Sequence, residues 1–149
     1  MENSLELVKL LNVIQQLNEN CAFVKEVNGY EILSFTKSEC DEIMIEMEAL
    51  ESHCRGGNET GFSSSVSEDA ARTALQTEAG DLVFNALLLC HILARDYSID
   101  LNAAIQSVRE KVTRRSPHVF PRTEGGEVEP ASTRAEAEAI WQREKAKEH

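Results

Sequence analysis

Two short acidic pairs are the residues of this chain best suited to carry out chemistry. Glu39 and Glu42 form the first pair, and Glu78 and Asp81 form the second. Each pair has i,i+3 spacing, which places both side chains on one face of a helix. Two such helices packed together would aim four carboxylates at one point. Mg²⁺ prefers oxygen ligands and is commonly shared with the phosphates of a substrate, so the pairs predict a magnesium site for a phosphorylated ligand.

Basic residues that would suit the phosphates follow downstream at Lys111, Arg114 and Arg115. Lys111 and Arg115 have i,i+4 spacing and share a helix face, as a clamp on a phosphate requires. The same residues also suit an ordinary basic helix end that complements the helix dipole. Their spacing alone leaves both interpretations open.

The acidic composition offers an ordinary explanation for any single acidic pair. Among 26 acidic residues, many pairs with this spacing fall on solvated helix faces, and Glu48 with Glu51 is one of them. The pair at Glu78 and Asp81 is different because it adjoins the most apolar stretch of the chain, residues 82–94. An uncompensated acid is costly to bury there, so its position favours a bound cation.

Length, charge and cysteine content restrict the class of protein. A chain of 149 residues is most simply a single domain over residues 1–149. The net charge of -11 argues against sequence-independent binding of nucleic acid. Polar residues interrupt the longest apolar run, the amino terminus lacks the features of a signal peptide, and the four cysteines have no CxxC spacing. We therefore expect a cytoplasmic protein with free thiols and no membrane partner.

The hydrophobic periodicity predicts an all-α fold of about five helices. The expected helices cover approximately residues 4–18, 34–50, 67–95, 101–115 and 133–147. Glycine and serine residues predict an exposed loop at about 51–67, and a linker leads into the last helix within about 121–149. The Asn28-Gly29 pair leaves a short β-hairpin within residues 22–33 as an alternative. Gly80, inside the central helix, indicates close packing or room for a ligand.

Three further residues lie near the acidic pairs. Glu46 falls on the helix face of the first pair and could assist a metal ligand. Cys40 suits packing better than nucleophilic attack, because acidic neighbours raise the pKa of a thiol. Asn85, one turn beyond Asp81, suits either substrate contact or a hydrogen bond to a neighbouring helix.

Four segments resemble, in order, the motifs of MazG-type nucleoside triphosphate pyrophosphohydrolases. The opening motif of that family is matched by Cys21, Lys25, Glu26, Phe35, Thr36, Glu39 and Glu42. The later motifs EELGD, KxxRRHPHVF and WxxxKxxE are matched by Glu78-Ala79-Gly80-Asp81, by residues 111–120, and by Trp141, Lys145 and Glu148. The resemblance therefore covers nearly the whole chain.

The resemblance implies a helical bundle whose core is completed by oligomerisation, with a homodimer as the smallest assembly. It implies cleavage of a nucleoside triphosphate between the α and β phosphates, dependent on Mg²⁺ with Mn²⁺ as a substitute, and a role in nucleotide-pool housecleaning. The metal ligands and catalytic carboxylates that it implies are Glu39, Glu42, Glu78 and Asp81, one glutamate acting on the attacking water. The phosphate-binding residues that it implies are Lys111 and Arg115, followed by Arg114 and His118.

The chain departs from the family pattern at several positions in or beside the first two motifs, the opening motif and EELGD. These positions are Ala22, Phe23, Val24, Val27, Asn28, Gly29, Ser38 and Thr77. These departures put substrate preference in question more than metal chemistry, because the carboxylate pairs are intact. Two alternatives stay open: a narrow-substrate relative, specific for deoxynucleotides or for phosphoribosyl-ATP, and a non-catalytic helical protein that binds nucleotides or another partner. A di-iron bundle is disfavoured because the chain contains no Glu-x-x-His motif.

Overall fold

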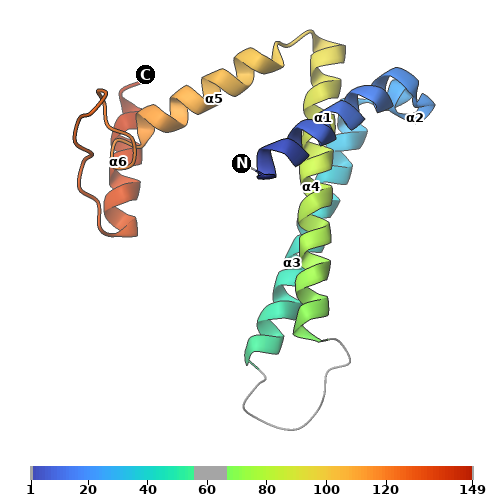
Figure 1. The fold of residues 1–149 in the computed structure, drawn as a ribbon, viewed down its shortest axis with the longest axis horizontal. Helices are drawn as coiled ribbons and strands as arrows, with labels where there is room; N and C mark the ends of the chain where they lie inside the picture. The colour runs from blue at the N-terminus through green and yellow to red at the C-terminus, as the bar shows by residue number, and fades with distance from the viewer. Residues whose placement is uncertain (1, 56–66, 149) are drawn as a thin grey trace. The chain divides into compact units, whose positions relative to one another are not determined.

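A computed structural model describes residues 2–55 and 67–148, which form six helices and no strand. The helices are α1 (Glu2–Asn20), α2 (Ala22–Glu26), α3 (Gly29–Arg55), α4 (Glu68–Tyr97), α5 (Leu101–Arg115) and α6 (Arg134–Ala146) (Figure 1). The predicted all-α class is confirmed. The chain divides into two compact units, Met1–Ser98 and Ile99–His149, which are described separately below.

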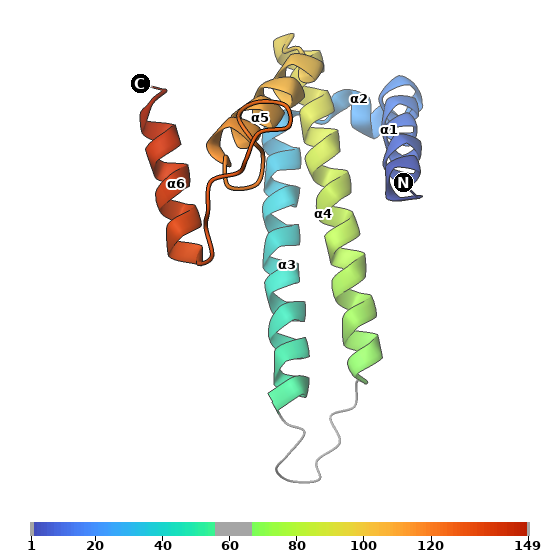
Figure 2. The ribbon, with the colours of Figure 1, turned by 60° about the vertical axis from the view of Figure 1, so that its left-hand side comes forward.

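The N-terminal unit is built on the pair of long helices α3 and α4, which lie side by side in both views (Figures 1 and 2). Helix α4 begins beside the first residue of the expected helix 67–95, where the Ser67 hydroxyl accepts a hydrogen bond from the Ala70 amide at 3.2 Å. The two helices run in opposite directions, so the middle of one faces the middle of the other. This arrangement places the two acidic pairs on neighbouring helices, as the sequence argument requires.

The start of α3 corrects the expectation for residues 22–33. The chain forms the short helix α2 there, and α3 begins at Gly29 rather than near residue 34. The Asn28 side-chain oxygen accepts hydrogen bonds from the amides of Tyr30 and Glu31 at 2.9 and 3.1 Å, and the Glu31 carboxylate accepts one from the Asn28 amide. This reciprocal capping begins a helix, so the β-hairpin interpretation is wrong.

Two other expectations also need correction. A β-carbon added at Gly80 would meet no atom within 4 Å, so close packing does not explain this glycine. Helix α3 continues to Arg55, so the first residues of the expected loop at 51–67 are helical. Residues 56–66 of that loop lie outside the described part of the chain.

The buried core of the N-terminal unit joins all four of its helices. Its members are Ile14, Val24, Val27, Ile32, Leu88 and Ile92. Helices α3 and α4 approach each other closely beside this core, where a β-carbon added at Gly29 would make an ordinary van der Waals contact of 3.4 Å with Leu93 Cδ2. The core therefore lies at one end of the α3 and α4 pair, next to the segment that carries Asn85.

Arg95 ties the short helix α2 and the chain after it to α4. Its guanidinium donates hydrogen bonds to the carbonyls of Val24 and Val27 at 2.7 and 2.8 Å. It also donates to the Asp96 carboxylate at 2.6 Å. Val24 and Val27 are themselves core residues, so one side chain satisfies the backbone of the segment that closes the core.

Large apolar side chains remain exposed over much of this unit. On α1 they are Leu5, Leu7, Val8, Leu11 and Val13, each at least 41% exposed, and on α3 they include Met44, Ile45 and Met47. The stripes that the sequence predicts are therefore present as helical faces, but much of each is not covered by this chain. Apolar faces of this extent typically mark interaction sites.

Helix α4 is long and apolar enough to cross a membrane by length and composition alone. It also carries Glu78, Asp81 and Asn85 and packs along α3. A single helix of this kind is weak evidence for a membrane span, because core helices pass the same test. We interpret α4 as the central helix of the bundle.

Side-chain caps mark the starts of both helices of the C-terminal unit. The Asp100 carboxylate accepts a hydrogen bond from the Ala103 amide at 3.0 Å at the start of α5. Thr133 and Glu136 form a capping box at the start of α6. Between the helices, Gly125 has a φ of +71°, which glycine adopts without strain. These local signals were readable in the sequence and set the boundaries of both helices.

A buried carboxylate holds the segment between α5 and α6 against α6. Glu144 is only 3% exposed and accepts hydrogen bonds from Arg122, Arg143 and Lys147 at 2.8 to 2.9 Å. The Arg122 guanidinium, followed by Lys147, lowers the pKa of Glu144 from 4.5 to about 2. This carboxylate is therefore charged in the folded protein throughout the neutral range.

Acid is expected to loosen the C-terminal unit. Because folding lowers the pKa of Glu144, its ion pairs stabilise the fold above the ordinary value of 4.5 and lose that effect as the pH falls toward about 2. Trp141 is the single tryptophan of the chain and reports on this unit. Its fluorescence should change over this pH interval, and Glu144→Gln should weaken the unit already at neutral pH. Emission that is identical for both proteins at every pH would contradict this account.

Candidate active site

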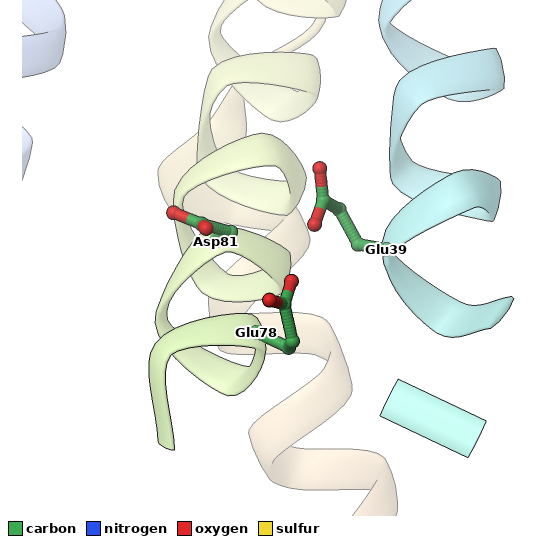
Figure 3. Close-up of side chains that lie close together, drawn as sticks. All are labelled: Glu39, Glu78 and Asp81. Carbon is green, nitrogen blue, oxygen red and sulfur yellow. The ribbon is translucent and has the colours of Figure 1, made fainter. Parts of the chain in front are cut away.

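The structure brings three of the four predicted metal ligands together. Glu39 extends from α3 toward Glu78 on α4, and Asp81 lies one helical turn beyond Glu78 (Figure 3). One carboxylate oxygen of each residue lies within 4.8 Å of the others. Glu39 and Glu78 are half-buried, whereas Asp81 is exposed. The group thus lies at the edge of the bundle, open to solvent on one side, where a substrate has access.

Negative charge is crowded around the carboxylate of Glu78. Partial burial raises the pKa of Glu78 above 4.5, and the nearby carboxylate of Glu42 raises it further. Asp81 and Glu39 add to the same effect. The other three predicted carboxylates therefore all act on Glu78, and Glu42 lies beside it. We refer to these four residues as the carboxylate cluster.

Asn85 supports the carboxylate cluster from the core side. Its amide is 9% exposed and donates a hydrogen bond to Glu39 Oε1 at 3.0 Å across the helix pair. Of the two roles considered for Asn85, the structure therefore shows the bond to a neighbouring helix. Glu78, Asp81 and Asn85 are spaced i, i+3 and i+7, so they line one face of α4 that runs from solvent into the core.

Replacement of Asn85 by alanine is expected to weaken metal binding. Without the amide, Glu39 loses the hydrogen bond that orients it, and loss of such a supporting partner typically costs about 10- to 100-fold in metal affinity. Titration with Mg²⁺ by calorimetry measures the effect. Thr77→Ala is a matched control on α4, because the Thr77 hydroxyl donates to the Thr73 carbonyl and, among the described residues, has no other hydrogen-bond partner. Equal affinity of the Asn85→Ala and wild-type proteins would show that the bond does not support the site.

The donor set of the cluster fits a hard divalent cation. It offers carboxylate oxygens only. The side chains that shift the pKa of Glu78 are all acidic, so no basic group among them offsets the repulsion between the carboxylates. Mg²⁺ and Mn²⁺ both accept such ligands. Glu46, also considered as a ligand, is half-buried on α3 and does not belong to the group of three within the described residues. Cys40 is an exposed free thiol.

The predicted phosphate-binding residues all lie in the C-terminal unit. Lys111 and Arg115 lie on α5, with Lys111 half-buried and with no hydrogen-bond partner in the described part of the chain. Arg114 and Arg115 both donate to the carboxylate of Glu148. His118 is half-buried, and its Nδ1 atom is buried without a hydrogen-bond partner within the same part.

Sequence reasoning did not assign the partners of these arginines. Glu148 and Trp141 were identified only as members of the closing motif, yet Glu148 accepts from both arginines and the Arg115 guanidinium lies 5.5 Å from the Trp141 ring centroid. The spacing of the closing motif did indicate that its residues lie close together. Trp141, Lys145 and Glu148 are separated by four and three residues, which places them on one side of a helix.

The fold is an all-α bundle in which two antiparallel helices bring together a carboxylate cluster whose oxygens could hold a cation. The MazG nucleotide pyrophosphohydrolase domain matches residues 29–120, which include the carboxylate cluster and the three candidate phosphate-binding residues of α5, Lys111, Arg114 and Arg115. The chain therefore belongs to the MazG family. The first five of its departures from the family motifs, at residues 22–28, lie outside the matched region.

Comparison with solved structures supports the same assignment. The crystal structure of a MazG-related protein from Thermotoga maritima matches with a TM-score of 0.65 and 27% identity. The similarity covers 93% of this chain and 97% of that one. No curated protein matches the sequence of this chain. The helical fold thus extends beyond residues 29–120 to most of the chain.

Proposed function

We propose that this protein is a magnesium-dependent nucleoside triphosphate pyrophosphohydrolase. Cleavage between the α and β phosphates would yield a nucleoside monophosphate and pyrophosphate. The observation that carries the proposal is the group formed by Glu39, Glu78 and Asp81, whose oxygens lie within 4.8 Å of one another in a chain of the MazG family. We also propose that the protein works in the cytoplasm on the nucleotide pool.

The carboxylate cluster would hold the metal through Glu39, Glu78 and Asp81. When bound, Mg²⁺ supplies positive charge against the triphosphate and lowers the pKa of a coordinated water. Glu42 lies beside Glu78 but outside the group of three, so it is the candidate to accept the proton of the attacking water. Asn85 keeps Glu39 in place through its 3.0 Å hydrogen bond.

Lys111, Arg114 and Arg115 would bind the phosphates. Attack at the α phosphate requires stabilisation of the departing pyrophosphate, and guanidinium and ammonium groups serve this purpose. The charge distribution is consistent with this division of work. Residues 1–98 hold 17 of the 26 acidic and 6 of the 15 basic residues, whereas residues 99–149 hold nine of each. The entire net charge of -11 thus lies in the unit that would bind the metal.

We also propose that the protein assembles as a homo-oligomer, with a dimer as the smallest assembly. The exposed apolar residues of α1 and α3 give each helix a face that this chain does not cover. A second copy would bury such faces and enlarge the small core, which contains six buried residues.

The reaction is tested by identifying the products from a panel of substrates. Ribo- and deoxynucleoside triphosphates and phosphoribosyl-ATP would each be incubated with the protein and Mg²⁺, and the products followed by phosphorus NMR. A monophosphate with pyrophosphate is the expected outcome for nucleoside triphosphates. Turnover restricted to deoxynucleotides or to phosphoribosyl-ATP would identify a narrow-substrate relative. A diphosphate with orthophosphate, or no product from any of them, would refute the proposal.

A further inference from the structure

Glu148 makes an unusual arrangement with the last two residues of α5. Its Oε1 atom accepts hydrogen bonds from Nε and Nη2 of Arg114 at 3.0 and 2.5 Å, and from Nε of Arg115 at 3.2 Å. Its Oε2 atom accepts from Nη2 of Arg115 at 2.5 Å. One carboxylate therefore holds two guanidinium groups, and the Arg115 and Arg114 guanidinium groups lower the pKa of Glu148 to about 2.

Each arginine bonds to Glu148 through the same edge of its guanidinium group. Each uses Nε and Nη2 for Glu148, and the Nη1 atoms of both have no hydrogen-bond partner among the described residues. A guanidinium has five N–H donors in a rigid plane, so this arrangement leaves donors of each group available. Trp141 fixes the plane of Arg115 further, with its ring centroid 5.5 Å from the guanidinium carbon. The available donors therefore have restricted directions.

Charge and space are also available for an anion. One carboxylate balances one of the two guanidinium charges, so the pair retains positive charge, and Lys111 lies one turn earlier on α5. Arg114 also borders a cavity of about 440 Å³ that is lined by three further charged side chains, those of Arg109, Arg122 and Glu110, and by Thr113. The two additional arginines and the threonine carry donors that suit phosphate oxygens, and they outnumber the single carboxylate.

We infer that Glu148 is a positioning residue that holds Arg114 and Arg115 ready for the phosphates of the substrate. This inference rests on the proposed function, because it takes the two arginines as the phosphate-binding groups. Prior orientation by Glu148 and Trp141 removes much of the entropy that a free arginine side chain would lose on binding. Glu148 would not touch the substrate, since its two oxygens are occupied by the arginines.

Replacement of Glu148 by glutamine should change the affinity for an anion in one direction through the lost charge and in the opposite direction through the lost orientation of the arginines. Removal of a negative charge beside two arginines should by itself strengthen the binding of an anion. Loss of orientation should weaken it, and we expect the dissociation constant of pyrophosphate to rise by about tenfold or more. Calorimetry with inorganic pyrophosphate and Mg²⁺ measures this affinity. The KM for a triphosphate should rise similarly, with a smaller change in kcat.

Glu144→Gln is the matched control. Glu144 also lies at the end of the chain and also pairs with arginines, but with Arg122 and Arg143 rather than with the proposed phosphate-binding pair. This variant should lower the Tm and leave the pyrophosphate affinity within about twofold, because its effect is on folding. Glu148→Asp retains the charge and should recover part of the lost affinity.

The outcomes separate this inference from the proposed function. Weaker pyrophosphate binding by Glu148→Gln, with recovery by Glu148→Asp, supports the positioning role even if no triphosphate is cleaved. Unchanged or tighter binding by Glu148→Gln overturns the inference, whether or not the wild-type enzyme turns over triphosphates. Absence of pyrophosphate binding by the wild-type protein, or equal loss of affinity in Glu144→Gln, also overturns it.

Discussion

Glu78→Gln is expected to lower the magnesium-dependent hydrolysis of nucleoside triphosphates by about 100-fold or more, the loss typical of removing one group that stabilises charge in the transition state. Glu78 contributes an oxygen to the group of three carboxylates and lies beside Glu42. A neutral amide keeps the shape of the side chain but binds a divalent cation weakly. Steady-state release of pyrophosphate measures the effect.

The same substitution should make the metal-free protein more stable. Folding raises the pKa of Glu78 above 4.5, so the ionised form is less favourable in the folded chain than in the unfolded one. The free energy of unfolding of the metal-free protein therefore falls as the pH rises from 4.5 through the raised value, and glutamine removes this loss. Near neutral pH, the Tm of Glu78→Gln in EDTA should exceed that of the wild type.

Glu48→Gln provides the control for both effects. Glu48 is an exposed acidic residue of α3 that does not belong to the carboxylate cluster. Its replacement should change neither the hydrolysis rate nor the response of the Tm to Mg²⁺. Added Mg²⁺ should raise the Tm of the wild type and of Glu48→Gln, because a ligand that binds the folded state stabilises it, but should not raise that of Glu78→Gln. Full activity of Glu78→Gln would exclude this residue as a metal ligand.

Arg95→Ala is expected to have the largest effect on stability among the polar substitutions considered. The variant leaves the carbonyls of Val24 and Val27 without the guanidinium that bonds to them at 2.7 and 2.8 Å. Loss of two charged hydrogen bonds in a partly buried site typically costs about 2–4 kcal/mol. Urea denaturation monitored by circular dichroism measures the free energy of unfolding.

Arg72→Ala on the same helix is the comparison for Arg95→Ala. Arg72 forms an exposed ion pair with Glu68 at i,i+4 spacing, and such pairs contribute about 0.3–0.5 kcal/mol. If the two variants lose the same stability, Arg95 does not hold α2 against the bundle. Activity of folded Arg95→Ala should remain close to wild type, because Arg95 lies outside the carboxylate cluster.

The sequence predicted the helices wherever local chemistry decides the structure. Ser67, Asp100 and Thr133 each cap the helix that was expected to follow them. The same local chemistry was misjudged at Asn28, whose pairing with Gly29 is common to hairpins and helix caps. The carboxylate of Glu31 decides between them, because it completes a reciprocal cap three residues later.

The carboxylate cluster was predictable because helix periodicity and two intact motifs agree on the same residues. Periodicity indicates which residues share a helix face but not which residue of another helix they contact. The hydrogen bond from Asn85 to Glu39 was therefore one of two open roles for Asn85 and could not be predicted. The pairing of Glu148 with Arg114 and Arg115 joins residues more than 30 positions apart. Such contacts depend on how α5 and α6 pack, which the spacing of residues within one helix does not determine.

Pyrophosphate release by the wild-type protein, compared in Mg²⁺ and in EDTA, tests whether the carboxylate cluster supports metal-dependent hydrolysis. We expect nucleoside triphosphates to yield pyrophosphate in Mg²⁺, with one monophosphate formed for each pyrophosphate, and EDTA to stop the reaction. Release that continues unchanged in EDTA would contradict the metal role of the carboxylate cluster. No release from any triphosphate in either condition would contradict the proposed enzyme activity itself.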